Sequence, residues 1–203
     1  MLSIGVLALQ GDFAEHVTAM RRAGADAREV RMPKDLEGLA GLIIPGGEST
    51  TITKLMGRWG LAEPIIAMAR RGEPIWGTCA GLIVIAERVV GGGAVPTLHL
   101  MDVDVARNAY GRQVDSFEAE VPIPVLGPEP FHTVFIRAPV VQRVGPAVEV
   151  LARLPDGSPI AVQQGNLLGS SFHPELTEDR RFHRYLLSLA ERRLGAARHA
   201  APV

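Results

Sequence analysis

The sequence predicts a single α/β domain of three layers, in which helices cover both faces of a mixed but mostly parallel sheet. Apolar runs of strand length alternate with helical patterns over the first ~85 residues, which is typical of a parallel sheet covered on both sides. Later segments alternate apolar and polar residues, which indicates antiparallel strands. No internal repeat and no linker divides the 203 residues, a length within the range of one domain.

The first strand and helix are expected within the first 24 residues. Residues 2–9 form a near-continuous apolar run, which fits a central strand of a parallel sheet that is buried on both faces. A polar turn follows at residues 10–12. Apolar residues then recur at helical spacing at Phe13, Val17 and Met20, and Gly24 ends the pattern. These features predict a strand followed by a helix.

Three more strands are expected before residue 80. Residues 27–32 and 42–44 predict the second and third strands. The polar residues 48–51 can cap a helix that begins near Thr50 and continues in two pieces to Arg71. A fourth strand then leads directly to Cys79. Because ligands bind beyond the carboxyl ends of parallel strands, Cys79 and the glycines at 46–47 are expected on one rim.

The second half of the chain predicts antiparallel strands and a closing helix. Residues 101–105 and 117–121 alternate, residues 148–152 and 159–162 read as a hairpin, and residues 167–172 form a further strand. Thr177 is expected to cap the last helix, with Glu178 and Asp179 in its first turn. The apolar face of that helix is expected at Phe182, Tyr185, Leu186 and Leu189. We expect the domain to span residues 1–195, followed by a flexible tail at residues 196–203.

Charge and cysteine content narrow the classes of partner and compartment. Lys and Arg total 21 against 22 Asp and Glu, without a long basic block, so neither nucleic acid nor a membrane surface is expected as a partner. A single cysteine cannot form an internal disulfide. Neither an apolar run of about 18 residues nor the basic start of a signal peptide is present. We therefore expect a cytoplasmic protein.

Cys79 has the sequence surroundings of a nucleophile. It lies in Gly77-Thr78-Cys79-Ala80-Gly81, the spacing that places a nucleophile at the sharp turn from a strand into a helix. Such a turn needs small neighbours, and the start of the following helix favours a thiolate. The alternative is that a lone cysteine is a small buried hydrophobe. The two flanking glycines favour the nucleophile.

His173 is the candidate base, because it is the histidine that has a carboxylate two residues away at the exit of an apolar strand. In extended chain the side chains of His173 and Glu175 point to the same side, so Glu175 can hold the imidazole by its far nitrogen. Cys79, His173 and Glu175 would then form a triad. A capping or surface histidine is the alternative, and the glycine-flanked cysteine favours the triad.

Acyl chemistry also needs backbone donors for an oxyanion. Ala80 N–H follows the nucleophile directly, and the glycine pair at 46–47 can supply a second donor, although the same pair also suits an ordinary turn. Arg107 and Arg137 can pair with a substrate carboxylate, but most arginines are solvated surface groups.

Other ligand classes lack their motifs. The glycines at 91–93 do not precede a helical pattern, and residues 46–51 lack the lysine of a phosphate-binding loop, so a nucleotide site is not supported. The remaining histidines considered, His99, His132, His183 and His199, lack metal-ligand spacing. We expect no metal and no cofactor on this chain.

Several segments resemble a known family. Residues 45–51, 77–82 and 171–175 together resemble the class I glutamine amidotransferases. Within that class, four further segments are similar to those of the glutaminase subunits of pyridoxal 5′-phosphate synthases: residues 5–11, 107–118, 135–139 and 173–177. The resemblance extends to Gly195. It implies a flavodoxin-like fold and hydrolysis of L-glutamine to L-glutamate and ammonia through a γ-glutamyl thioester.

The resemblance also implies a role for each matching residue. Cys79 would be the nucleophile, His173 the general base and acid, and Glu175 the residue that orients His173. Gly47 and Ala80 would hold the oxyanion. The residues expected to contact L-glutamine are Gly47, Glu48, Ser49, Arg107, Ile136 and Arg137.

The resemblance further implies that this chain forms a hetero-oligomer with a synthase subunit of the (β/α)₈ type, which receives the ammonia. Two departures stand out: Ala106 replaces the glutamate usual before Arg107, and residues 140–146 diverge. Two alternatives stay open. The chain could be the glutaminase subunit of another amidotransferase, or a non-catalytic regulatory binding subunit with the same fold.

Overall fold

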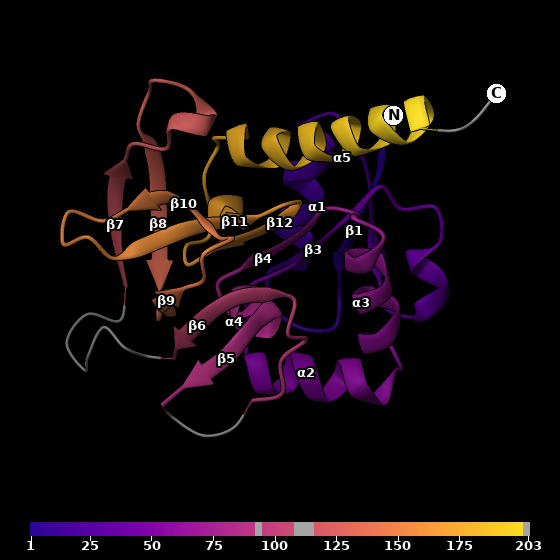
Figure 1. The fold of residues 1–203 in the computed structure, drawn as a ribbon, viewed down its shortest axis with the longest axis horizontal. Helices are drawn as coiled ribbons and strands as arrows, with labels where there is room; N and C mark the ends of the chain where they lie inside the picture. Colours follow the sequence, from indigo (N-terminus) through magenta and orange to yellow (C-terminus); the bar gives the residue numbers. More distant parts are fainter. Residues whose placement is uncertain (92–94, 108–115, 201–203) are drawn as a thin grey trace.

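A seven-stranded sheet forms the centre of the molecule (Figure 1). The computed structural model describes residues 1–91, 95–107 and 116–200. Strand order in the sheet is β10-β11-β12-β4-β3-β1-β2, and the five strands from β12 to β2 are parallel. The strands are β1 (Ser3–Leu7), β2 (Asp26–Val30), β3 (Gly41–Ile44), β4 (Ile75–Thr78), β10 (Glu149–Arg153), β11 (Pro159–Gln164) and β12 (Leu167–Ser170).

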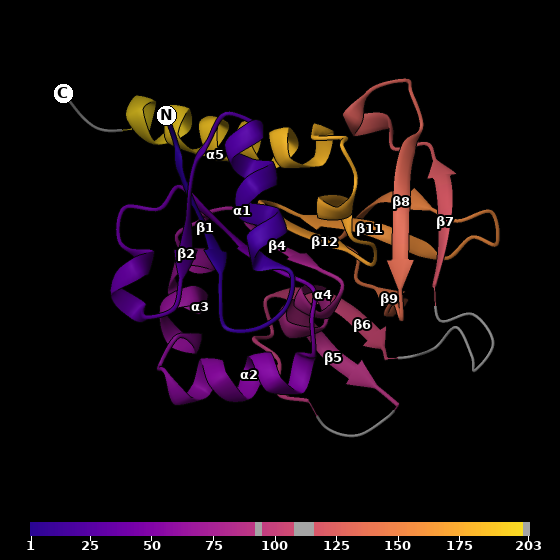
Figure 2. The same cartoon turned by 180° about the vertical axis from the view of Figure 1, so that it is seen from behind.

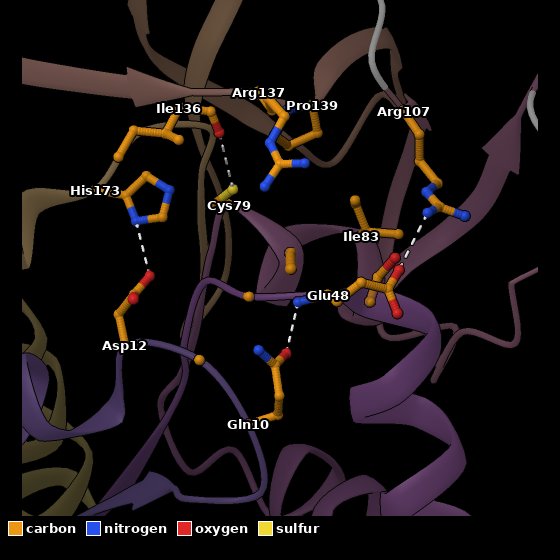
Figure 3. Close-up of a pocket in the computed structure, with 14 residues that line it drawn as sticks. Gln10, Asp12, Glu48, Cys79, Ile83, Arg107, Ile136, Arg137, Pro139 and His173 are labelled. Atoms are coloured by element: carbon orange, nitrogen blue, oxygen red, sulfur yellow. Dashed lines mark hydrogen bonds and ion pairs between the residues drawn. The ribbon is translucent and has the colours of Figure 1, made fainter. Parts of the chain in front are cut away.

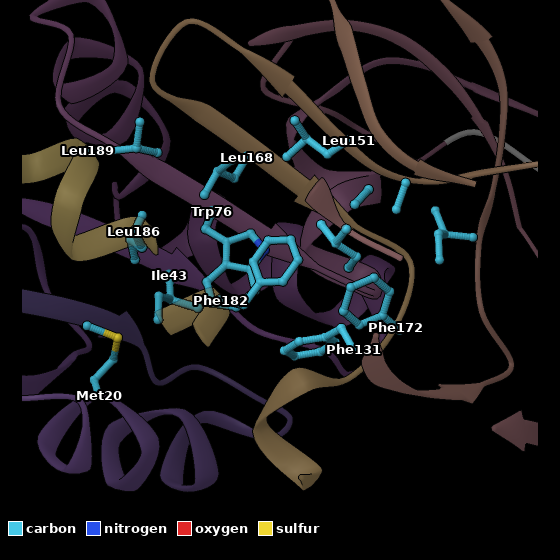
Figure 4. Close-up of a cluster of buried hydrophobic side chains, with 14 of the residues drawn as sticks. Met20, Ile43, Trp76, Phe131, Leu151, Leu168, Phe172, Phe182, Leu186 and Leu189 are labelled. Atoms are coloured by element: carbon cyan, nitrogen blue, oxygen red, sulfur yellow. The ribbon is translucent and has the colours of Figure 1, made fainter. Parts of the chain in front are cut away.

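Helices cover both faces of this sheet, which confirms the predicted three layers (Figures 1 and 2). One face packs against α1 (Phe13–Arg22) and α5 (Arg181–Ala200), and the other against α2 (Ser49–Arg58), α3 (Ala62–Arg70) and α4 (Ala80–Ile85). On the first face, Trp76 lies among aromatic and aliphatic side chains (Figure 4). Burying apolar surface on both sides explains why the central strands read as continuous apolar runs.

Two small sheets complete the fold. A three-stranded sheet joins β5 (Ala86–Val90), β6 (Met101–Ala106) and β9 (Val140–Val144), and a hairpin joins β7 (Ser116–Val121) to β8 (Phe131–Ile136). In the part of the chain that the structure describes, three short 3₁₀ turns connect other elements: η1 (Pro33–Leu36), η2 (Pro124–Leu126) and η3 (Pro174–Leu176). The predicted antiparallel pairing is confirmed for β7 with β8 and for β10 with β11. β6 differs from the prediction in part, since it pairs parallel with β5 and antiparallel with β9.

The start of the last helix corrects the sequence prediction. Thr177 does not cap α5, because residues after His173 first form the 3₁₀ turn η3, and α5 begins only at Arg181. Asp179 supplies the cap instead, since its Oδ1 accepts a hydrogen bond from Arg181 N at 2.9 Å. The predicted strand at residues 167–172 is also shorter, ending at Ser170.

At its other end, α5 continues past Gly195 to Ala200. The helix thus runs across the predicted boundary at residue 195. That boundary and the flexible tail at residues 196–203 remain predictions. Residues 201–203 lie outside the described part of the chain. None of the helices in the described ranges is long and apolar enough to cross a membrane.

Candidate active site

The order of the central strands brings the predicted site residues to one edge of the sheet. β4 lies between β3 and β12, with Gly77 opposite Ile44 and Thr78 opposite Ser170. The chain leaves these parallel strands at the same edge, so the glycines at 46–47, Cys79 and His173 follow three neighbouring strand ends. β1 lies beside β3, which brings residues 10–12 to the same edge. The predicted rim is confirmed.

The backbone at Cys79 makes the predicted sharp turn between β4 and α4. Its φ of 48° and ψ of −107° lie where side chains other than glycine are rare. A Cβ at Gly81 would lie 1.9 Å from Ile44 O, and a Cβ at Gly77 would lie 2.4 Å from Gly81 O. Glycine is therefore required at both flanking positions. The side chain of Cys79 is largely buried, and its Sγ lies 3.9 Å from Ile136 O.

His173 is held beside Cys79 by two carboxylates. Its Nδ1 lies 2.7 Å from Glu175 Oε1 and 3.3 Å from Asp12 Oδ2. Figure 3 shows its ring beside the Cys79 sulfur, with the nitrogen that does not face Asp12 turned toward the sulfur. That nitrogen, Nε2, is buried and makes no hydrogen bond within the described residues. The imidazole thus has one nitrogen held by acids and one directed at the thiol.

The charges around His173 shift its pKa and that of Glu175 in opposite directions. Burial disfavours the imidazolium, but the neighbouring Asp12, Cys79 and Glu175 outweigh burial and raise the pKa of His173 well above its usual value. Burial likewise disfavours the Glu175 carboxylate, but His16 and His173 outweigh burial and lower the pKa of Glu175. The carboxylate is therefore ionised at neutral pH and favours a proton on His173.

A cavity of about 380 Å³ opens over Cys79 and His173. All the residues expected to contact a substrate or hold an oxyanion line it (Figure 3): Gly47, Glu48, Ser49, Ala80, Arg107, Ile136 and Arg137. Gly46 stands just outside, where a Cβ would lie 2.5 Å from His173 Cε1. Glu175 lies behind His173, buried. The structure therefore brings every predicted site residue to one cavity or its supporting wall.

Glu48 connects the cavity to α2 and to Arg107. Its carboxylate accepts hydrogen bonds from Thr50 N at 3.3 Å and Thr51 N at 2.8 Å, which confirms the predicted polar cap. Arg107 Nη2 lies 3.2 Å from Glu48 Oε1, so Arg107 is held at the cavity although Ala106 precedes it. The hydroxyl and N–H groups of Thr50 and Thr51 outweigh burial and lower the pKa of Glu48 to about 2.

Sequence reasoning missed several residues at the site. Gln10, Asp12, Ile83 and Pro139 also line the cavity, and Gln10 Oε1 accepts a hydrogen bond from Glu48 N at 2.6 Å. The signal for Gln10 and Asp12 was available, because they follow the end of the first strand as Cys79 follows the fourth. Three more missed residues lie behind Glu175: His16, Thr78 and His183.

Asp12, His173 and Glu175 are also the group in the described ranges whose donor atoms could surround a metal ion, since these atoms lie within 4.8 Å of one another. Because His173 Nδ1 already pairs with both carboxylates, acid–base chemistry accounts for the cluster. Some sequence predictions lie outside the described part of the chain: residues 108–115 of the segment after Arg107, residues 92–93 and the side chain of His199.

Comparison with known proteins gives consistent results. Residues 6–192 match the SNO glutamine amidotransferase family. The chain is 56% identical over 191 residues to a Dehalococcoides mccartyi protein named pyridoxal 5′-phosphate synthase subunit PdxT, covering 94% of this chain and 98% of that one. It is 52% identical over 189 residues to a Roseiflexus sp. protein of the same name, covering 93% and 100%.

Two solved structures resemble this chain to different degrees. A crystal structure described as a glutamine amidotransferase superposes with a TM-score of 0.88 at 53% identity, covering 93% of this chain and 98% of that one. A structure described as PurLQS from Thermotoga maritima superposes with a TM-score of 0.63 at 16% identity, covering 95% and 98%. The second similarity concerns the fold alone.

Proposed function

Because this chain belongs to the SNO glutamine amidotransferase family, we propose that it hydrolyses L-glutamine to L-glutamate and ammonia as the glutaminase subunit of a pyridoxal 5′-phosphate synthase. The observation that carries the proposal is that Cys79 and His173 lie together in the cavity, with Glu175 holding His173 Nδ1 from behind. Relatives with 52–56% identity that are named PdxT support a pyridoxal 5′-phosphate synthase, and not another amidotransferase, as the enzyme that receives the ammonia.

In the first step, the Cys79 thiolate attacks the side-chain amide carbon of glutamine. The resulting oxyanion accepts hydrogen bonds from the N–H groups of Gly47 and Ala80, residues that both line the cavity. His173 then donates the proton on Nε2 to the departing nitrogen. The carbon–nitrogen bond breaks, ammonia leaves, and a γ-glutamyl thioester remains on Cys79.

In the second step, His173 is neutral and its Nε2 accepts a proton from water. The hydroxide attacks the thioester carbonyl and the carbon–sulfur bond breaks. The product leaves with a neutral γ-carboxyl group, which gives its proton to water to form glutamate. Nε2 keeps the proton opposite the restored thiolate, so the site returns to its starting state. Glu175 holds the Nδ1 proton throughout, so that the same nitrogen acts in both steps.

The charges that line the cavity suit the two ends of an amino acid. Arg107 and Arg137 are the groups available for the α-carboxylate, and Glu48 is ionised at neutral pH and available for the α-ammonium. Ser49 and the Ile136 backbone complete the contacts. No cofactor takes part in these steps.

Ammonia that reached bulk water at neutral pH would be protonated and lose its nucleophilicity. We therefore include in the proposal a direct transfer to a (β/α)₈ synthase subunit in a hetero-oligomer, located in the cytoplasm. The single cysteine, with no partner for an internal disulfide, is in keeping with a reducing compartment.

The test is synthesis of pyridoxal 5′-phosphate by the complex with Cys79→Ala in place of the wild-type glutaminase. Alanine is smaller than cysteine and leaves the two flanking glycines unchanged, so the variant is expected to fold and to bind the synthase. Glutamine should then support no synthesis, while added ammonium should support the wild-type rate. Glutamine-dependent synthesis by Cys79→Ala at the wild-type rate would refute the proposal.

A further inference from the structure

Two histidines that the proposed mechanism does not use lie directly behind Glu175. We propose that His16 and His183 are positioning residues for the glutaminase reaction. They act by fixing Glu175 Oε2, the carboxylate oxygen that does not pair with His173. The inference rests on the proposed function, because Glu175 matters for catalysis only if His173 is the base. His16 comes from α1 and His183 from α5, so the two helices on one face of the sheet would both support the site.

The contacts form one continuous network of side chains that ends at His173. His183 Nε2 lies 3.2 Å from His16 Nδ1, and His16 Nε2 lies 3.2 Å from Glu175 Oε2. Glu175 Oε1 lies 2.7 Å from His173 Nδ1. Thr78 Oγ1, at the end of the strand that precedes Cys79, lies 3.1 Å from His16 Nε2. Each carboxylate oxygen of Glu175 therefore faces a different imidazole.

All side chains of this network are buried. His16, Thr78 and His183 are fully buried, and Glu175 is 6% exposed. Trp76 packs edge-on against both rings, with centroids 5.6 Å from His16 and 5.2 Å from His183. Buried polar groups are costly unless they are paired, so these side chains have little freedom to turn away from one another.

With one ring proton on His16 and one on His183, a single arrangement of protons gives both His16 contacts a donor and an acceptor. Burial and the neighbouring His16 hold the pKa of His183 well below its usual value, so His183 is neutral and carries one ring proton. Because Glu175 is ionised, His16 must direct an N–H, and not a lone pair, at Oε2. In a neutral His16 the Nδ1 lone pair then accepts the Nε2 proton of His183.

This arrangement explains how the network of His183, His16 and Glu175 would serve catalysis. With Oε2 facing the His16 ring at 3.2 Å, Oε1 is left for His173 Nδ1, and the ring proton of His173 stays on that side. Nε2 is then the nitrogen that exchanges protons next to Cys79 in both steps. Asp12 contacts Nδ1 at the longer distance of 3.3 Å and is partly exposed, so it does not replace a fixed Glu175.

The experiment compares three variants in the complex with the synthase, assayed as glutamine hydrolysis. His16→Leu removes both nitrogens, whereas His16→Gln keeps an N–H that can reach Oε2. Phe182→Leu is the matched control. Phe182 is fully buried, precedes His183 and stacks on Trp76 with centroids 5.1 Å apart. Its side chain has no polar atom, so it takes no part in the polar contacts of the network.

We expect His16→Leu to lower kcat by about tenfold or more with KM for glutamine within about twofold of the wild-type value. His16→Gln should recover most of that loss, and Phe182→Leu should lower the melting temperature but leave kcat within about twofold. Wild-type kcat in folded His16→Leu, or an equal loss of kcat in the Gln and Leu variants, would overturn the inference while leaving the proposed function intact.

Nitrogen NMR on the wild-type protein with ¹⁵N-labelled histidine gives a second test that does not depend on an activity measurement. We expect a protonated Nε2 and a bare Nδ1 for His16, assigned by loss of its signals in His16→Gln. The reverse tautomer would overturn the inference. Failure of the wild-type complex to hydrolyse glutamine would instead refute the proposed function.

Discussion

The backbone of Cys79 occupies a region of φ and ψ that a cysteine rarely adopts, and the residues around it maintain that conformation. Cys79 N donates to Ser170 O at 2.8 Å, which fixes the turn against the neighbouring strand β12. The glycines on both sides leave no room for a Cβ. The sulfur is thereby held at the cavity by covalent geometry, before any substrate binds.

Gly46 tests how closely the base is packed. A Cβ at this position would lie 2.5 Å from His173 Cε1 and 3.0 Å from Asp12 Oδ2, so Gly46→Ala must displace the imidazole. We expect kcat for glutamine hydrolysis to fall about tenfold or more, with a loss of about 1–3 kcal/mol in the free energy of unfolding. Enzyme assay and urea denaturation measure the two effects.

The control is Gly57→Ala, because a Cβ at Gly57 in α2 meets nothing within 4 Å. It should leave kcat unchanged and raise stability by up to about 1 kcal/mol, since alanine favours a helix. Unchanged kcat in Gly46→Ala would show that the base does not depend on this contact.

Several of these residue positions followed from the sequence alone. Cys79, Gly77 and Gly81 were predictable because the turn from strand to helix imposes a local spacing. His173 with Glu175 was predictable because the two residues are neighbours in an extended segment. The contact of Glu175 with His16 was not, because the helix pattern of residues 13–20 gives no sign that one buried position meets a carboxylate from the far end of the chain.

Among the elements, α5 depends on a cap that the sequence pattern assigned to the wrong residue. Thr177 and Asp179 are both good caps, but Pro174 begins a 3₁₀ turn that ends at Leu176, and α5 starts only at Arg181. Asp179 accepts from Arg181 N and also pairs with the Arg181 side chain at 2.6 Å. Sequence spacing alone cannot choose between the two caps.

Asp179→Ala should therefore lower the free energy of unfolding by about 1 kcal/mol, because the first turn of α5 loses an acceptor. The neighbouring Glu178→Ala is the control, since that side chain is 88% exposed and its partner Arg22 is also exposed. Chemical denaturation of both variants measures the difference. An equal effect of the two substitutions would contradict the assignment of the cap.

The three-stranded sheet is joined by a charged row across its strands. Asp104 in β6 lies between Arg88 in β5, at 2.7 Å, and Arg143 in β9, at 3.0 Å. Hydrogen bonds from Arg143 and then Arg88 lower the pKa of Asp104 to about 2. Since Arg107 follows directly after β6, this row also supports one wall of the cavity.

The lowered pKa makes a pH-dependent contribution to stability. A carboxyl whose folded pKa lies below its unfolded value of about 4 stabilises the protein above pH 4, and this contribution is lost as pH falls toward 2. Asp104→Asn should therefore be less stable at neutral pH and show a flatter loss of stability between pH 4 and pH 2. Urea denaturation across that range measures it, with the exposed Glu63→Gln as control. A parallel decline in Asp104→Asn and wild type would contradict this account.

For the whole molecule, two apolar layers meet at one sheet and leave its carboxyl edge free for the site. Trp76 points into the layer under α1 and α5, and its neighbour Ile75 points into the layer under α2, α3 and α4. The strand β4 is therefore fixed from both sides where it presents Cys79. A site built on a strand held in this way keeps its geometry better than one built on loops.

The fold class was predictable because the sequence of the parallel strands β1 to β4 and their helices alternates apolar runs with helical patterns. The two small sheets were less predictable. β5 follows the six-residue helix α4 without a turn signal, and β9, which completes the same sheet, comes from the divergent segment far along the chain. Their pairing depends on contacts between distant segments, which local spacing does not encode.

The most direct measurement of the central claim is covalent labelling of the protein, in complex with the synthase, by a glutamine analogue that carries a diazoketone in place of the side-chain amide. A nucleophilic Cys79 predicts a single adduct at Cys79 by peptide mass mapping, slowed by added L-glutamine and absent from Cys79→Ala. An adduct on a different residue, or labelling of Cys79 that L-glutamine does not slow, would contradict the claim.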